Sequence, residues 1–206
     1  MWFERGISMV DLSFEEKAVL TLYQKFYDEE YPVPKDKREL EESERMTNDH
    51  VKAQKMCYLL NLAGLNIGGF SYSWNTYGPF SPGLLVVLRG LDRKYMQVRA
   101  YYDKKLSDDV LYSSSIDSVF WPESKTVIQT LKEALRISEN KERIRDWVEL
   151  LGSIAYISIN EYPHGCFEWI NDELKQRKRK YINDDENNRA WEVLRSANLL
   201  PGWDIL

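Results

Sequence analysis

The chain has 206 residues and a mass of 24.4 kDa, the size of one ordinary domain. Hydrophobic residues make up 43% and charged residues 30%, a balance that excludes a disordered or fibrous chain. The net charge of −5 argues against a global attraction to nucleic acid or to an anionic membrane. The N-terminus lacks the pattern of a signal peptide, and no apolar run reaches the ~18 residues of a membrane span. Two cysteines cannot form a disulfide framework, so we expect a cytoplasmic protein without membrane contact.

The N-terminal part carries the signal of an amphipathic helix. Ser13 and Glu16 have capping-box spacing, and apolar residues follow at intervals of three and four as far as Phe26. This pattern predicts a helix over 13–31, ending before Pro32. The following segment, 35–46, is almost wholly charged and is predicted to be a solvated helix or a linker.

Residues 56–88 contain no charged residue and no histidine. At the overall composition, 33 residues would hold roughly ten charges, so this run is predicted to form the buried centre of the molecule. Its first helix is expected to stop at Gly64. Residues 70–77 alternate aromatic and small polar side chains, as a short strand does. Ser81 is the expected N-cap of a further helix with Pro82 at its first position, and we expect that helix to be buried all round.

The remaining chain divides into an insert of uncertain structure at 92–122, for which a helix is favoured, and a helical C-terminal half at 124–199. In that half, the clearest helical period falls within 144–155, and Asn183 with Glu186 resembles the cap of the last helix. The sequence therefore predicts a mainly α, single domain over 1–206, with a motif core at 45–90 that holds a short strand or hairpin between two buried helices. The predicted core residues are Met56, Leu60, Phe70, Leu84, Val87, Leu88, Trp147, Leu151, Ile154 and Trp191.

A resemblance to known proteins lies in the stretch VKAQKMCYLLNLAG followed by FSYSWNTYGPFSPGL. It is similar to the bacterial YwgA-like proteins and, more remotely, to the Panacea (SocA-like antitoxin) domain. In both, a helix with a K-x-Q-K pattern precedes a short strand, then Y-G-P and another helix. Two later stretches, DWVELLGSIAYI and ENNRAWEVLRSANLL, resemble the family's later buried helix and its C-terminal helical hairpin. The residues that carry the main pattern are Lys52, Gln54, Lys55, Met56, Tyr58, Tyr77, Gly78, Pro79, Phe80 and Ser81.

The resemblance implies a mostly helical domain of bacteria and phages. Panacea-type members are associated with neutralising toxins by direct contact, and SocA-like members with presenting a toxin to a protease. No catalytic residue, cofactor or metal is implied. The first 40 residues and the insert at 92–118 have no counterpart in the pattern, and such insertions commonly determine the choice of partner.

The loop after the predicted strand is the first candidate binding site. A glycine that supplies an unusual backbone angle and a Ser-Pro helix start are structural features, so internal packing is the simpler interpretation. The functional interpretation is a contact loop, because aromatic residues beside a helix start can anchor a protein partner. The first hypothesis is therefore a non-enzymatic module that binds a toxin, nuclease or other effector without a cofactor. Its predicted partner-binding residues are Trp74, Tyr77, Gly78, Pro79, Phe80 and Ser81.

The second candidate is the basic run at 175–180, between two predicted helices. It could be a solvated helix end, since bases favour the negative end of a helix dipole. It could also contact DNA phosphates as the turn of a helix-turn-helix does, although three acidic residues follow at 184–186. A DNA-binding regulator is thus the alternative function. Its predicted residues are Lys175, Arg177, Lys178, Arg179 and Lys180.

Catalytic and metal-binding patterns are weak. Neither the Walker pattern G-x-x-x-x-G-K-S/T nor the pattern G-x-G-x-x-G occurs, so no nucleotide-binding motif is present. His50 and Cys57 are seven residues apart on one helical face and have no recognised zinc spacing. His164 and Cys166 are two residues apart, and the flanking carboxylates lead us to expect an unreactive thiol. A third hypothesis remains, an enzyme whose site is assembled from dispersed residues such as these two, Tyr58 and Tyr77. We expect no metal and no cofactor.

Overall fold

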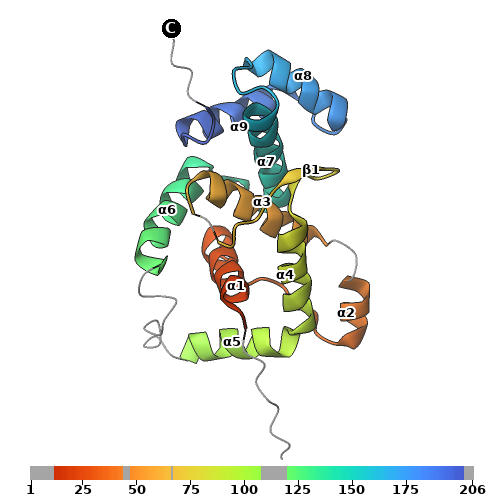
Figure 1. Ribbon diagram of the computed structural model, residues 1–206, viewed down its shortest axis with the longest axis vertical. Helices are drawn as coiled ribbons and strands as arrows, with labels where there is room; N and C mark the ends of the chain where they lie inside the picture. The colour runs from red at the N-terminus through yellow and green to blue at the C-terminus, as the bar shows by residue number, and fades with distance from the viewer. Residues whose placement is uncertain (1–11, 44–46, 66, 108–119, 202–206) are drawn as a thin grey trace, which may run out of the picture.

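The computed structural model describes residues 12–43, 47–65, 67–107 and 120–201, and its architecture is mainly α, as predicted (Figure 1). A two-stranded antiparallel hairpin lies between α3 and α4, with Trp74 opposite Pro79. A 3₁₀ helix, Ser138–Arg143, leads into α7. The elements are α1 Phe14–Tyr27, α2 Lys37–Ser43, α3 Asn48–Leu62, β1 Ser73–Asn75, β2 Gly78–Phe80, α4 Pro82–Arg93, α5 Tyr95–Ser107, α6 Phe120–Ala134, α7 Ile144–Asn160, α8 Phe167–Arg177 and α9 Asp184–Ser196.

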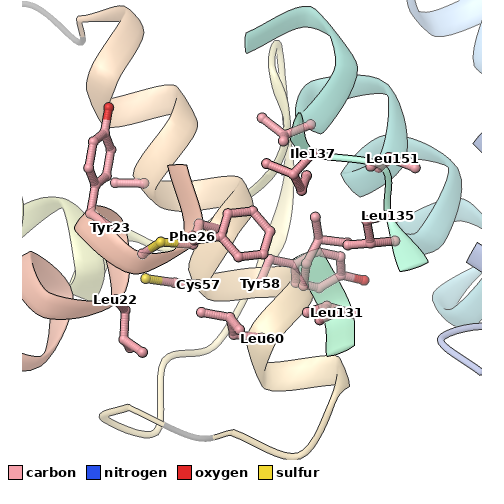
Figure 2. Close-up of a cluster of buried hydrophobic side chains, with 14 of the residues drawn as sticks. Leu22, Tyr23, Phe26, Cys57, Tyr58, Leu60, Leu131, Leu135, Ile137 and Leu151 are labelled. Carbon is pink, nitrogen blue, oxygen red and sulfur yellow. The ribbon is translucent and has the colours of Figure 1, made fainter. Parts of the chain in front are cut away.

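Helix α1 is central, with α3, α4 and α6 packed around it (Figure 1). Helix α3 also packs against α7, and α7 carries α8 and α9 at the end of the molecule opposite α5. Figure 2 shows the junction of these helices, where Phe26 of α1 lies between side chains of α3 and α6. The core is therefore continuous from α1 through α3 to α7. Side chains at this junction include Leu22, Phe26, Cys57, Tyr58, Leu60, Leu131, Leu135, Ile137 and Leu151.

Side-chain caps fix several helix starts where the sequence places them. Ser13 and Glu16 form a reciprocal capping box on α1. Ser81 accepts a hydrogen bond from the Leu84 amide with Pro82 at the first position of α4, and Asn183 caps α9 in the same way. These three predictions are confirmed.

Some predicted boundaries are wrong. Helix α1 ends at Tyr27 and does not continue to residue 31, because Asp28 adopts a left-handed conformation with φ of 58°. The loop that is predicted after the strand at 70–77 contains β2. Helix α6 begins at Phe120, ahead of Pro122, since proline is tolerated in a first helical turn. Within the insert at 92–122, α5 is helical as favoured, while 108–119 lie outside the described residues.

Burial corrects two further expectations. Helix α4 is not buried all round: Leu84, Leu88 and Leu91 face the interior, whereas Val86 is 72% exposed. Val87 and Phe70, both predicted core residues, are only partly buried against the core; the other eight predicted core residues are buried. Within the described ranges, none of the helices combines the length and apolarity needed to span a bilayer.

Candidate functional site

The hairpin lies along one face of α7. Tyr77, near the turn, stacks under the Arg145 guanidinium at 5.6 Å, and Trp74 contacts Tyr156 at a centroid distance of 5.7 Å. Near these two contacts, the backbones of the hairpin and of α7 approach each other closely. Gly78 has φ of +84°, and a Cβ there would lie 2.5 Å from Ser153 Oγ, so only glycine fits.

Helix α3 holds the hairpin from the other side. The Gln54 side-chain amide donates to the Ser81 carbonyl and accepts from the Ser81 amide, both at 2.9 Å. The Lys55 ammonium donates to the Pro79 carbonyl at 2.5 Å. The two halves of the pattern that resembles YwgA-like proteins, K-x-Q-K and Y-G-P-F-S, therefore contact each other directly.

Lys55 is buried although it carries an ionisable group. Its side chain is enclosed where α3, α7 and the hairpin meet, with its methylenes against Gly152 and Pro79. Burial, with a smaller contribution from the nearby Lys178 ammonium, lowers the pKa of Lys55 to about 7. No carboxylate forms an ion pair with Lys55 among the described residues.

Glu149 is the buried carboxylate of this junction. Lys178 donates to Glu149 Oε1 at 2.7 Å, with both side chains almost inaccessible to solvent. The Lys180 ammonium lies 3.0 Å from Oε2, in ion-pair contact without hydrogen-bond geometry. Burial lowers the pKa of Lys178 to about 8, while Glu149 opposes that shift. We call the group Lys55, Arg145, Glu149, Lys178 and Lys180 the hairpin charge cluster.

The predicted contact loop is mostly built into this junction. Gly78, Pro79 and Ser81 are buried, so their side of the loop faces α3 and α7. Trp74, Tyr77 and Phe80 are half-buried and keep some accessible surface. Partner binding by these six residues stays a prediction, and its accessible part is limited to the three aromatic side chains.

The basic run at 175–180 is largely neutralised by carboxylates of the same chain. Arg177 pairs with Glu161 and Glu173 and stacks on Trp74 at 4.8 Å. Lys175 pairs with Asp184, Lys178 with Glu149, and Lys180 with Asp146 and Glu149. Arg179 alone in the run has no ion pair among the described residues. DNA binding stays a prediction, with only one of its five bases free of a carboxylate.

The cysteine and histidine candidates lie apart. Cys57 is buried in α3, where desolvation raises the pKa of its thiol far above the ordinary value. Cys166 is half-buried at the start of α8, and its hydrogen bond lowers the pKa of Glu168. His164 is exposed. Across the described ranges, no three histidine, cysteine or acidic side chains group as metal ligands would.

A histidine–aspartate pair that the sequence did not reveal joins α3 to α4. His50 Nε2 lies 2.9 Å from Asp92 Oδ2, and the Tyr31 hydroxyl donates to Asp92 Oδ1 at 3.3 Å. The Thr47 amide donates to His50 Nδ1, so the proton of the neutral ring is on Nε2 and points to Asp92. All three side chains are buried, and the pair therefore serves as a structural contact between α3 and α4.

A small cavity of about 70 Å³ lies between the end of α1 and the start of α7, away from the hairpin. Its size corresponds to two or three water molecules. Tyr27, Glu29, Lys141 and Ile144 are among its lining residues. It does not coincide with any of the predicted site residues.

Sequence reasoning missed the charged residues that the fold buries. One usable signal is that Lys55 directly precedes the apolar stretch MCYLL and that Glu149 interrupts the apolar stretch WVELLG. A charge in the middle of an apolar helix face requires a partner or a function. A second signal is Thr47 followed by His50, the capping-box spacing with a ring nitrogen in place of a carboxylate.

Compared with known proteins, the chain matches no family model, no curated protein and no solved structure.

Proposed function

We propose that this protein is a non-enzymatic, cytoplasmic protein-interaction module of YwgA-like or Panacea-like type. It would act beside a toxin, nuclease or other effector in a bacterial or phage defence setting. The partner would contact the accessible aromatic side chains of the hairpin, Trp74, Tyr77 and Phe80.

The observation that carries this proposal is the direct contact between the two halves of the resembling pattern. Gln54 and Lys55 on α3 fix the backbone of Pro79 and Ser81, which holds the hairpin in one conformation. A surface that is ordered before binding loses little conformational entropy when a partner docks. Half-exposed aromatic residues on such a surface are the residue type that most often dominates binding energy.

The test is co-expression and pull-down with the product of the adjacent gene, using Tyr77→Ala and Phe80→Ala. Trp169→Ala is the matched control, because Trp169 is a 60% exposed aromatic residue on α8, outside the hairpin. We expect both hairpin variants to weaken capture at least tenfold while the control retains it. If the neighbour is not captured, or if all three variants capture it equally, the proposal is wrong.

A further inference from the structure

The hairpin charge cluster contains more positive than negative groups. Lys178 and Lys180 share the Glu149 carboxylate, and Lys180 also reaches Asp146. Lys55 has a carbonyl oxygen as its acceptor. With both buried lysines protonated, four cations face two carboxylates. The cations are Lys55, Arg145, Lys178 and Lys180, and the carboxylates belong to Asp146 and Glu149.

Lys55 and Lys178 are the buried cations of this group, and burying them is costly because each charge loses its hydration and the like charges repel one another. Burial is the main cause of the lowered pKa values of Lys55 and Lys178. The Lys178 charge adds to the lowering at Lys55, and the Lys180 and Arg145 charges add to the lowering at Lys178. An added anion would relieve this repulsion. The same anion would raise both pKa values towards their ordinary range.

Arg145 identifies where an acceptor is missing. Its Nε is buried and has no hydrogen-bond partner, while its guanidinium lies over the Tyr77 ring. Arg177, over the neighbouring Trp74, differs in having two carboxylates. A buried guanidinium nitrogen without an acceptor is unusual, since arginine normally has its donors satisfied.

We propose that a small phosphate-type oxyanion binds at the turn end of the hairpin, between Arg145 and Lys180 and beside Tyr77. Arg145 is half-buried and the Lys180 side chain is 44% exposed, so this end of the cluster is open to solvent. Arginine provides a planar pair of donors for such an anion and lysine a point charge. The Lys178 side chain is only 4% exposed, so it would attract the anion through its charge without direct contact.

A free phosphate or small phosphate ester fits this place better than a polymer backbone. The buried lysines lie beneath the hairpin, where a duplex cannot reach them. The rim offers one arginine and one lysine, Arg145 and Lys180. Lys180 also contacts Asp146 and Glu149, and the other bases of the run except Arg179 pair with carboxylates, so few charges are left for a polymer backbone. This inference is independent of any protein partner and goes beyond the proposed function.

The experiment measures binding of inorganic phosphate to the full chain at pH 6.5 by isothermal titration calorimetry. Sodium chloride keeps the ionic strength constant, and the melting temperature is followed in parallel. The variants are Arg145→Gln and Lys180→Gln. Arg143→Gln is the matched control, because Arg143 is two residues away, loses the same charge and pairs with Glu186 outside the cluster.

We expect the parent chain and Arg143→Gln to bind phosphate equally. Their melting temperature should rise by about 3–5 °C at ten times the Kd. Arg145→Gln and Lys180→Gln should each weaken binding at least tenfold, and Arg145→Lys should restore part of it. Absence of phosphate binding by the parent chain overturns the proposal. Equal binding by all variants also overturns it, because the anion then binds elsewhere.

Discussion

Two buried carboxylates of this protein have different surroundings. Asp92 lies where α1 and its following segment meet α3 and α4, and Glu149 lies where α7 meets the hairpin. Asp92 accepts hydrogen bonds from neutral groups, the His50 ring and the Tyr31 hydroxyl. Glu149 contacts the ammonium groups of Lys178 and Lys180. Neutral donors satisfy a carboxylate without burying a second charge, whereas cations compensate it and bring their own desolvation cost. The hydrogen bonds at Asp92 therefore join the helices without a buried excess of charge, whereas the junction around Glu149 retains an excess of positive charge.

The largest expected effect comes from removing the Glu149 charge. Glu149→Gln leaves Lys178 buried beside Lys55 without a carboxylate, and we expect a loss of about 3–5 kcal/mol in the free energy of unfolding. Asp92→Asn should cost less, about 1–3 kcal/mol, because the asparagine oxygen can still accept one of the two hydrogen bonds. Urea denaturation at pH 6.5 in phosphate-free buffer measures both.

The double variant Glu149→Leu with Lys178→Met is the control for this difference. Replacing both partners with apolar residues removes the unpaired charge, so stability should recover most of the loss. Equal losses for Glu149→Gln and Asp92→Asn would show that the two junctions do not differ electrostatically.

The second effect concerns packing at the hairpin. Gly78→Ala places a methyl group 2.5 Å from Ser153 Oγ at a positive φ, and we expect a loss of about 2–3 kcal/mol. Gly69→Ala is matched, since Gly69 also has a positive φ but open space around its Cβ position, and it should cost only about 1 kcal/mol. Thermal and urea unfolding of the two variants compare steric overlap with backbone strain. Equal losses would mean that the hairpin yields at Ser153.

Helix starts were readable from the sequence, because a cap and its amide lie within three residues of each other. Ser13, Ser81 and Asn183 are examples. The charge cluster was not readable, because Lys55, Glu149 and Lys178 come from three separate elements and meet only after α3 packs on α7. The mainly α architecture followed from periodicity, while the end of α1 depended on one left-handed residue, Asp28. Val86 shows the limit of composition, since an apolar helix still has a side that faces solvent.

A third difference between the junctions should appear in the pH dependence of stability. Lys55 has a pKa of about 7 in the folded chain and an ordinary value of 10.5, so between these values the unfolded chain binds more protons. Stability should therefore rise by about 1–2 kcal/mol from pH 6.5 to 8.5 in phosphate-free buffer. Lys178 contributes in the same direction above its pKa of about 8. Urea midpoints across this range measure the slope.

The tyrosines around α1 act in the opposite direction at higher pH. Burial raises the pKa values of Tyr23, Tyr27 and Tyr31 in the folded chain, so the stability they contribute is fully present below about pH 10 and is lost above it. Lys55→Met should remove the larger part of the rise below pH 8.5 and leave the decline above pH 10 unchanged. If the rise in stability with pH persists in Lys55→Met, a group other than Lys55 causes it.

The smallest effects are expected at the exposed bases of the run 175–180, which tests whether those bases serve the fold or a ligand. Lys175→Gln removes a solvent-accessible pair with Asp184, and Arg179→Gln removes a base without an ion pair, so each should change the free energy of unfolding by less than about 0.5 kcal/mol. A gel shift with duplex DNA at about 50 mM salt is the functional comparison, because each phosphate contact contributes about 0.9 to the logarithmic salt slope. With four of the five bases held by carboxylates of the same chain, we expect no shift for the parent protein. A shift that is lost in both variants would instead establish the run as a nucleic-acid contact, and would show that DNA phosphates displace Asp184 from Lys175.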